Sequence, residues 1–284
     1  MLEILVPVSF LTVLLEYSGW LDRLDFLLSP LMGLLSLPPA AALPILVGML
    51  TGIYGAIAAM SVLPFTVDQM TLMAIFVLIS HNLVQEGIIQ GRSGINPILA
   101  TVARLTASVL TVVVVARFLD AGVDPVASAE SAGAAAGGLS AVLADWCVAT
   151  ACLSLKIFGI IMALMVVMGL MKHFNLIPFI LRPLTPALKA LGLDREVGLL
   201  WLTAVVFGLS YGAAVIVEET RDGQVPPEML TRLHVSIGIN HSMVEDPALF
   251  LPLGIGAFWL WVPRLIMAIV AVRLVAPLFF DFRS

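Results

Sequence analysis

The chain has few charged residues for its length: of 284 residues, 12% are Asp, Glu, Lys or Arg, whereas 61% are hydrophobic. A soluble globular domain carries about 25% charged residues. No charged residue occurs from Phe26 to Val67, and the segments 197–217 and 247–263 also lack charge. A helix that crosses a bilayer needs about 20 mostly apolar residues, so each gap has room for much of a span. We therefore expect an all-α protein that crosses a membrane several times.

Other absences exclude several function classes. The net charge is −5, so no basic surface suggests a nucleic-acid partner. Cys147 and Cys152 are the only cysteines, and their spacing fits no zinc pattern. Neither a Gly-x-Ser-x-Gly elbow nor a phosphate-binding Gly-x-x-x-x-Gly-Lys-Ser/Thr loop occurs. We therefore expect the chain to be no enzyme and to hold no cofactor, with the bilayer and a small polar solute as its partners.

Long, continuously apolar runs predict helices rather than the alternating strands of a membrane barrel, because backbone in lipid must satisfy its own hydrogen bonds. The segments 24–37 and 175–191 contain prolines and are short, so they either span, lie in the interface or pack as short helices. These runs amount to about eight to ten membrane helices. The candidates are 2–19, 24–37, 41–63, 69–90, 95–119, 155–172, 175–191, 196–217, 229–250 and 254–280.

The two halves of the chain share a pattern that predicts an internal repeat. Segment 3–31 aligns without a gap with segment 156–184. The polar matches carry most weight, since apolar helices resemble one another easily. These matches, with the first half named first, are Tyr54-Gly55-Ala56 and Tyr211-Gly212-Ala213, 79–86 and 239–246, and Arg104-Leu105 and Arg264-Leu265.

The repeat defines the expected domains. We expect membrane repeats over 1–120 and 155–284, joined by 121–154, whose first part is rich in Ala, Gly and Ser as linkers are. Whether the apolar residues 141–153 span the membrane, lie flat or dock is left open. An odd number of spans in each half would make the repeats inverted, as in many secondary transporters, whose solute binds near the midplane where the repeats meet. The distribution of Lys and Arg does not decide the orientation.

Each half places a His, an amide or hydroxyl neighbour and an acid near the centre of a predicted span. Charged side chains at that depth cost about 2.5–3.5 kcal/mol, so they normally face a cavity or a partner. His241 and Glu245 are four residues apart and would share a helix face, as would His81 and Gln85. The candidate solute- or ion-binding residues are His81, Asn82, Gln85, Glu86, Asn240, His241, Ser242, Glu245 and Asp246, with Tyr54 and Tyr211 as further lining residues.

Gly87 directly follows Glu86, and Pro247 directly follows Asp246. Helix breakers after polar residues predict helices that are interrupted inside the membrane, which would expose backbone groups to a ligand. The alternative interpretation is structural, in which the same polar groups hold helices together. Arg104 and Arg264 would either pair with the acids or extend to the headgroups.

Leu43 to Ala56, Gly208 to Ala213 and the two polar stretches together resemble the nucleoside-recognition, or Gate-domain, membrane proteins. This family includes the spore maturation membrane proteins, and related domains occur in the ferrous iron transporter FeoB and in concentrative nucleoside transporters. The resemblance covers both halves and implies a transport role for a nucleoside-like solute. It does not extend to the iron transporter's nucleotide-binding domain or to its membrane cysteines.

The sequence thus favours a secondary transporter or permease in the inner membrane of a prokaryote. His81 and His241 would bond the solute or relay protons. Glu86, Glu245 and Asp246 would carry a coupling proton or Na⁺, and the amides would orient the solute. Two alternatives stay open: a non-transporting scaffold or signalling component, or a carrier of divalent cations. A homo-oligomer or a sister membrane subunit is a further expectation.

Overall fold

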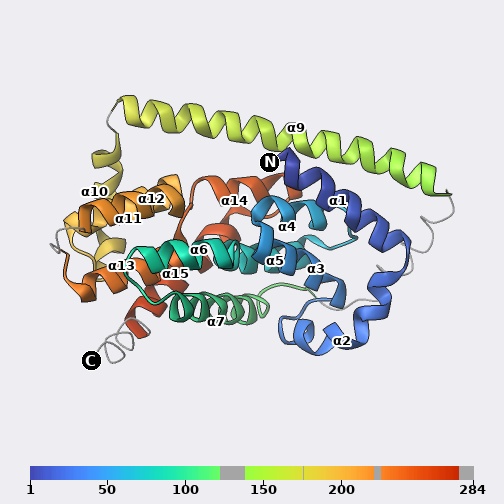
Figure 1. Cartoon of the computed structure of the whole chain (residues 1–284), viewed down its shortest axis with the longest axis horizontal. Coiled ribbons are helices and arrows are strands. Elements are labelled where there is room, and N and C mark those ends of the chain that lie inside the picture. The colour runs from blue at the N-terminus through green and yellow to red at the C-terminus, as the bar shows by residue number, and fades with distance from the viewer. Residues whose placement is uncertain (122–137, 175, 221–224, 275–284) are drawn as a thin grey trace. The chain divides into compact units, whose positions relative to one another are not determined.

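A computed structural model describes residues 1–121, 138–174, 176–220 and 225–274 (Figure 1). Helices make up the regular structure of this part and no strand occurs in it, which confirms the all-α prediction. The helices are α1 (Leu2–Tyr17), α2 (Trp20–Leu34), η1 (Pro39–Ala41), α3 (Ala42–Thr51), α4 (Ile53–Met60), α5 (Val67–Ser80), α6 (Leu83–Arg92), α7 (Pro97–Val115), α9 (Gly138–His173), α10 (Ile177–Ala190), α11 (Arg195–Phe207), α12 (Leu209–Thr220), α13 (Pro227–Asn240), α14 (Glu245–Phe250), η3 (Leu251–Leu253) and α15 (Ala257–Leu274).

Four of the helical segments in the described residues are long and apolar enough to cross a membrane. A bent pair, 26–34 with 39–51, would raise this number to five if it counts as one span. The chain is therefore a multi-pass membrane protein, and the larger number of spans expected from the sequence stays a prediction. The four segments are Val67–Arg92, Pro97–Val115, Gly138–Met171 and Ala257–Leu274.

The chain forms two compact units, each assembled from separate stretches of sequence. The first unit contains 1–82, 109–159 and 250–260. The second unit contains 83–108, 160–249 and 261–284. This division concerns compactness rather than sequence similarity, so the repeats over 1–120 and 155–284 stay a prediction.

In the first unit, α3 and α4 form a tight corner at Gly52. The φ angle of Gly52 is 91°, a left-handed value that favours glycine. A Cβ atom at Gly52 would lie 2.9 Å from both amide atoms of Asn82. Glycine at this position therefore allows the α3–α4 corner to approach the end of α5.

A single helix, α9, covers the helix expected over 155–172 together with residues 141–153, for which the sequence left spanning, lying flat and docking open. It runs from Gly138 to His173 and is the longest helix in the described residues (Figure 1). Within the first unit, Trp146 Nε1 donates to Ser9 Oγ at 3.1 Å, and the ring centroids of Phe10 and Trp146 are 5.2 Å apart. The stretch 141–153 is thus the helical start of α9 and contacts α1, while 122–137 lie outside the described residues.

In the second unit, α11 and α12 meet at Gly208 in the same way as α3 and α4 meet at Gly52. The φ and ψ angles of Gly208 are 83° and 168°, close to the 91° and −173° of Gly52. A Cβ atom at Gly212 would lie 2.5 Å from Ala204 Cβ and 2.6 Å from Ala204 Cα. Recurrence of this corner supports the predicted repeat, which over its full length stays a prediction.

Candidate functional site

Two helices end inside the polar stretches, but not where the breakers were expected to act. α5 ends at Ser80 and α13 ends at Asn240, so the interruption precedes the acids. The prediction that the breaks follow Glu86 and Asp246 is therefore wrong. Gly87 lies within α6, because a glycine costs a helix only about 1 kcal/mol. Pro247 lies in the first turn of α14, where its missing N–H group costs little.

The residues directly after each break have the same backbone geometry. His81 and His241 are extended, with ψ angles of 159° and 166°. Asn82 and Ser242 follow with φ angles of 48° and 49°, a left-handed conformation that is uncommon for residues other than glycine. Such conformations cost free energy and are typical of functional or tightly constrained segments.

Each break is held by main-chain carbonyls near the end of the helix that precedes the corner. The last carbonyls of any helix lack an intrahelical partner. In the first unit, Asn82 N donates to Gly48 O of α3 at 3.3 Å. In the second unit, Ser242 N and Met243 N donate to Ala204 O and Val205 O of α11 at 3.2 and 2.7 Å. Carbonyls close to each corner glycine therefore fix the polar segment that follows the break.

The two histidines are buried, and each ring faces back along its own helix. His81 Nδ1 lies 3.1 Å from Val77 O, and His241 Nδ1 lies 2.8 Å from Ile237 O. Because a carbonyl oxygen only accepts, these contacts place the proton on Nδ1 and leave Nε2 as an acceptor in the neutral ring. In this tautomer Nε2 is the nitrogen that each histidine presents to other groups.

In the second unit, Glu86 connects α6 with α7 and with the end of α13. Glu86 Oε2 lies 2.9 Å from Arg104 Nη1, and Glu86 Oε1 lies 3.2 Å from His241 Nε2. All three side chains are buried. A short contact between a carboxylate and a neutral Nε2 acceptor requires a proton, so this pair shares a proton or holds His241 as imidazolium. The contact thus joins a carboxylate and an imidazole through one proton.

Arg264 of α15 closes the C-terminal end of α13. Its Nη2 atom donates to His241 O at 2.9 Å and to Ile239 O at 3.3 Å, and its Nε atom also donates to Ile239 O. The side chain is fully buried. A cation at a helix C-terminus is stabilised by the helix dipole as well as by these hydrogen bonds.

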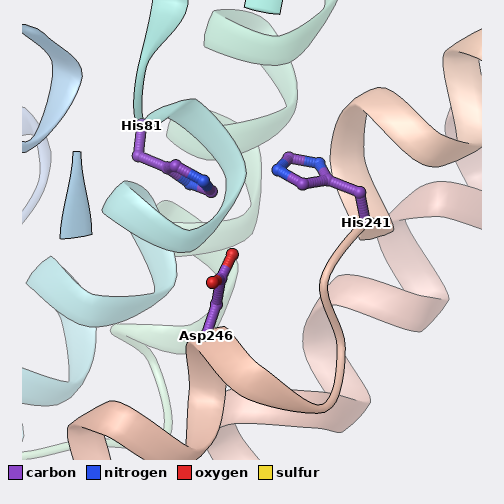
Figure 2. Close-up of side chains that lie close together, drawn as sticks. All are labelled: His81, His241 and Asp246. Atoms are coloured by element: carbon purple, nitrogen blue, oxygen red, sulfur yellow. The ribbon is translucent and has the colours of Figure 1, made fainter. Parts of the chain in front are cut away.

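Asp246 belongs to the same polar cluster. Figure 2 shows the ring of His241 and the carboxylate of Asp246 pointing toward the same space. Asp246 is within electrostatic range of His241 and Arg264. We call Glu86, Arg104, His241, Asp246 and Arg264 the buried charge cluster. It contains two guanidinium groups and two carboxylates, which balance one another, and the proton between Glu86 and His241 adds one positive charge.

The remaining predicted residues take different positions. Asn240 is fully buried and Ser242 is buried, whereas Asn82, Glu245 and Tyr54 are half-buried. Gln85 lies on the exposed side of α6. The break after His81 changes the helix phase, so Gln85 does not share a helix face with His81. The side chain of Tyr211 lies outside the described residues.

The second unit also contains a set of buried, hydrogen-bonded residues that the sequence did not predict. Gln90 Nε2 donates to His234 O at 3.1 Å, and His234 Nε2 lies 3.1 Å from Ser93 O. Gly238 makes room for the Gln90 side chain, since a Cβ atom at Gly238 would lie 2.9 Å from Gln90 Nε2. A small cavity borders Gln90, Arg104 and His234. His234 has no counterpart in the first half and no neighbouring acid, so no sequence signal marked it.

The candidate residues offer few ligands for a resident metal within one unit. His241 and Asp246 supply an imidazole nitrogen and carboxylate oxygens, while Glu86 is already paired with Arg104. Zinc normally takes four ligands, mostly Cys or His. The carrier of divalent cations therefore stays a prediction.

Comparisons with known proteins agree with the family expected from the sequence. The chain is 25% identical over 276 residues to the uncharacterized membrane protein YvoD of Bacillus subtilis (strain 168), covering 96% of this chain and 88% of YvoD. No solved structure matches the chain. The model of the Gate family, described as nucleoside recognition, matches residues 1–121. The first half of the chain is thus similar to the Gate family, described as nucleoside recognition.

Proposed function

We propose that the chain is a secondary transporter or permease for a small polar, nucleoside-like solute in the inner membrane of a prokaryote. The buried charge cluster would form the solute-binding region, and a proton or Na⁺ would drive transport. The family description supports the class of solute, while the residues of the second unit support the position of the site.

The contact of Glu86 with both Arg104 and His241 carries this proposal. Burying charged groups costs several kcal/mol, and a hydrophobic replacement for a buried ion pair is often at least as stable. Packing alone therefore gives little reason for such a cluster. Its position at the end of α13, where a helix is interrupted, is typical of substrate sites in transporters.

The His241–Glu86 contact favours a proton as the coupling ion. Na⁺ is a hard cation that prefers several oxygen ligands with net negative charge. The carboxylate of Glu86 is already compensated by Arg104. The group 3.2 Å from Glu86 is instead an imidazole nitrogen, and histidine is a common proton relay in proteins.

Uptake of labelled nucleosides and nucleobases into proteoliposomes, with and without an imposed proton gradient, tests the proposal. We expect gradient-dependent uptake that falls at least about tenfold in Glu86→Gln, since binding or coupling interactions of about 1.4 kcal/mol or more are lost. The matched control is Glu228→Gln, which removes an exposed carboxylate from the ion pair with Arg232. Unaltered uptake in Glu86→Gln, or no uptake of any solute by the native protein, would refute the proposal.

A further inference from the structure

Asn240 and Arg264 hold buried polar atoms with unmet hydrogen-bonding capacity in the second unit. Both side chains are fully buried. Among the described residues, neither Nδ2 nor Oδ1 of Asn240 has a hydrogen-bond partner, and the same holds for Nη1 of Arg264. Buried polar side chains nearly always have partners, so an amide with both atoms unpaired needs an explanation.

The two side chains belong to one place in the fold. Asn240 is the last residue of α13. Arg264 bonds the carbonyls of Ile239 and His241, the residues on either side of Asn240. The unmet groups therefore lie at the interruption of α13, which also contains the predicted binding residues.

The unmet groups define what would satisfy them. The Asn240 amide lacks an acceptor for Nδ2 and a donor for Oδ1, and Arg264 Nη1 lacks an acceptor. A solute that places a carbonyl oxygen beside an N–H group offers acceptor and donor together. An asparagine amide pairs with such an edge through two hydrogen bonds, as it does with nucleobases.

The charges indicate that this solute is neutral. Arg264 and Arg104 together balance Asp246 and Glu86, and the remaining positive charge is the coupling proton that Glu86 and His241 share, so no charge is left to hold a charged solute. A charged solute would bring an uncompensated charge into a buried place, at high cost.

We propose that Asn240, with Arg264 beside it, recognises a neutral solute through a cis-amide edge, as found in nucleobases and in other cyclic ureides. This inference rests on the proposed function and names the solute class and the residue that selects it. Asn240 acts as a specificity-determining residue, and Glu86 with His241 serves the coupling ion.

Binding of uracil to the purified full-length protein, measured by calorimetry, tests the inference. The comparison ligand is dimethyluracil, in which methyl groups replace both N–H protons and leave the carbonyls in place. A site that pairs with the N–H group should prefer uracil by about a hundredfold or more, because the analogue leaves buried groups unpaired. Hydantoin, a cyclic ureide, shows whether the site needs the nucleobase ring or only the amide edge.

Asn240→Leu is the main variant, since leucine has a similar shape but no polar atoms. We expect uracil affinity to fall at least about tenfold. Without ligand, the unfolding midpoint should stay the same or rise, because unpaired buried groups have been removed. Asn240→Asp retains acceptors but not the donor, and we expect intermediate binding.

The matched control is Asn96→Leu. Asn96 is exposed, and its Oδ1 atom accepts from Ile98 N and Leu99 N at the start of α7, a structural role. This variant should lower the unfolding midpoint and leave uracil affinity unchanged. Equal binding of uracil and dimethyluracil, or undiminished uracil affinity in Asn240→Leu, would overturn the inference while the transporter proposal stands. If the native protein neither binds any of these solutes nor transports them into proteoliposomes, the transporter proposal fails as well.

Discussion

The guanidinium of Arg264 donates a hydrogen bond of 2.9 Å to the main-chain carbonyl of His241, the residue at which α13 is interrupted. A helix end that is buried in the protein leaves carbonyls that water cannot reach, and each unmet group costs free energy. Arg264 meets this need for the carbonyls of Ile239 and His241. The interruption is thereby made compatible with burial.

Arg264→Gln should therefore destabilise the protein strongly. It removes a cation from two buried carbonyls, and we expect the free energy of unfolding to fall by about 2–4 kcal/mol. Chemical denaturation in mixed micelles measures this loss. Arg273→Gln is the control, since Arg273 makes the same kind of contacts to Lys189 O and Ala190 O at the exposed end of α10. Arg273→Gln should lower the free energy of unfolding by about 1 kcal/mol or less. If both variants lowered it equally, burial would not explain the effect of Arg264.

Glu86→Gln should destabilise the folded state and Arg104→Met should partly compensate. Removing one partner of a buried ion pair leaves an unpaired charge and costs about 3–5 kcal/mol, whereas replacing both partners is often nearly neutral. The double-mutant cycle measured by equilibrium unfolding tests this coupling. The exposed pair of Glu228 and Arg232 is the control, with an expected coupling below about 1 kcal/mol. Additive effects of Glu86→Gln and Arg104→Met would show that the two side chains do not act as a pair.

Gly212→Ala should loosen the corner between α11 and α12. The new Cβ atom would lie 2.6 Å from the backbone Cα of Ala204, so the helices must separate. We expect a loss of about 1–3 kcal/mol, typical of overpacking, with a lowered thermal unfolding midpoint. Gly159→Ala in α9 is the control, because nothing lies within 4 Å of its Cβ position. That variant should be neutral or gain up to about 1 kcal/mol from helix propensity, and the two variants should not behave alike.

The two cysteines report whether α9 crosses the membrane. Cys147 and Cys152 are free and exposed on α9, whose residues Gly138–Met171 are apolar enough to span. Thiols inside the bilayer core form thiolate poorly, so neither should react with a membrane-impermeant maleimide in intact vesicles. Both should react after denaturation in detergent. Rapid labelling of either thiol in sealed vesicles would show that its part of α9 lies in water.

The candidate site was only partly accessible from the sequence. The duplicated polar stretches and the nearby arginines were visible, and the structure pairs Arg104 with Glu86. The exposed position of Gln85 was not visible, because the break after His81 changes the direction of the following side chains. Nor was the group of Gln90, His234 and Ser93, whose contacts join residues more than a hundred positions apart in the sequence. The membrane segments, in contrast, followed from local apolar content.

The sequence by itself determined that this protein is helical and membrane-bound, that its first half is similar to Gate-domain proteins, and that polar groups recur in its two halves. These properties depend on composition and short spacing, which act on each segment independently. Only the tertiary structure decided where the helices break and which charges meet. Whether α13 ends at Asn240 depends on Arg264 and on the carbonyls of α11, and such long-range partners satisfy a backbone that local sequence alone would leave helical.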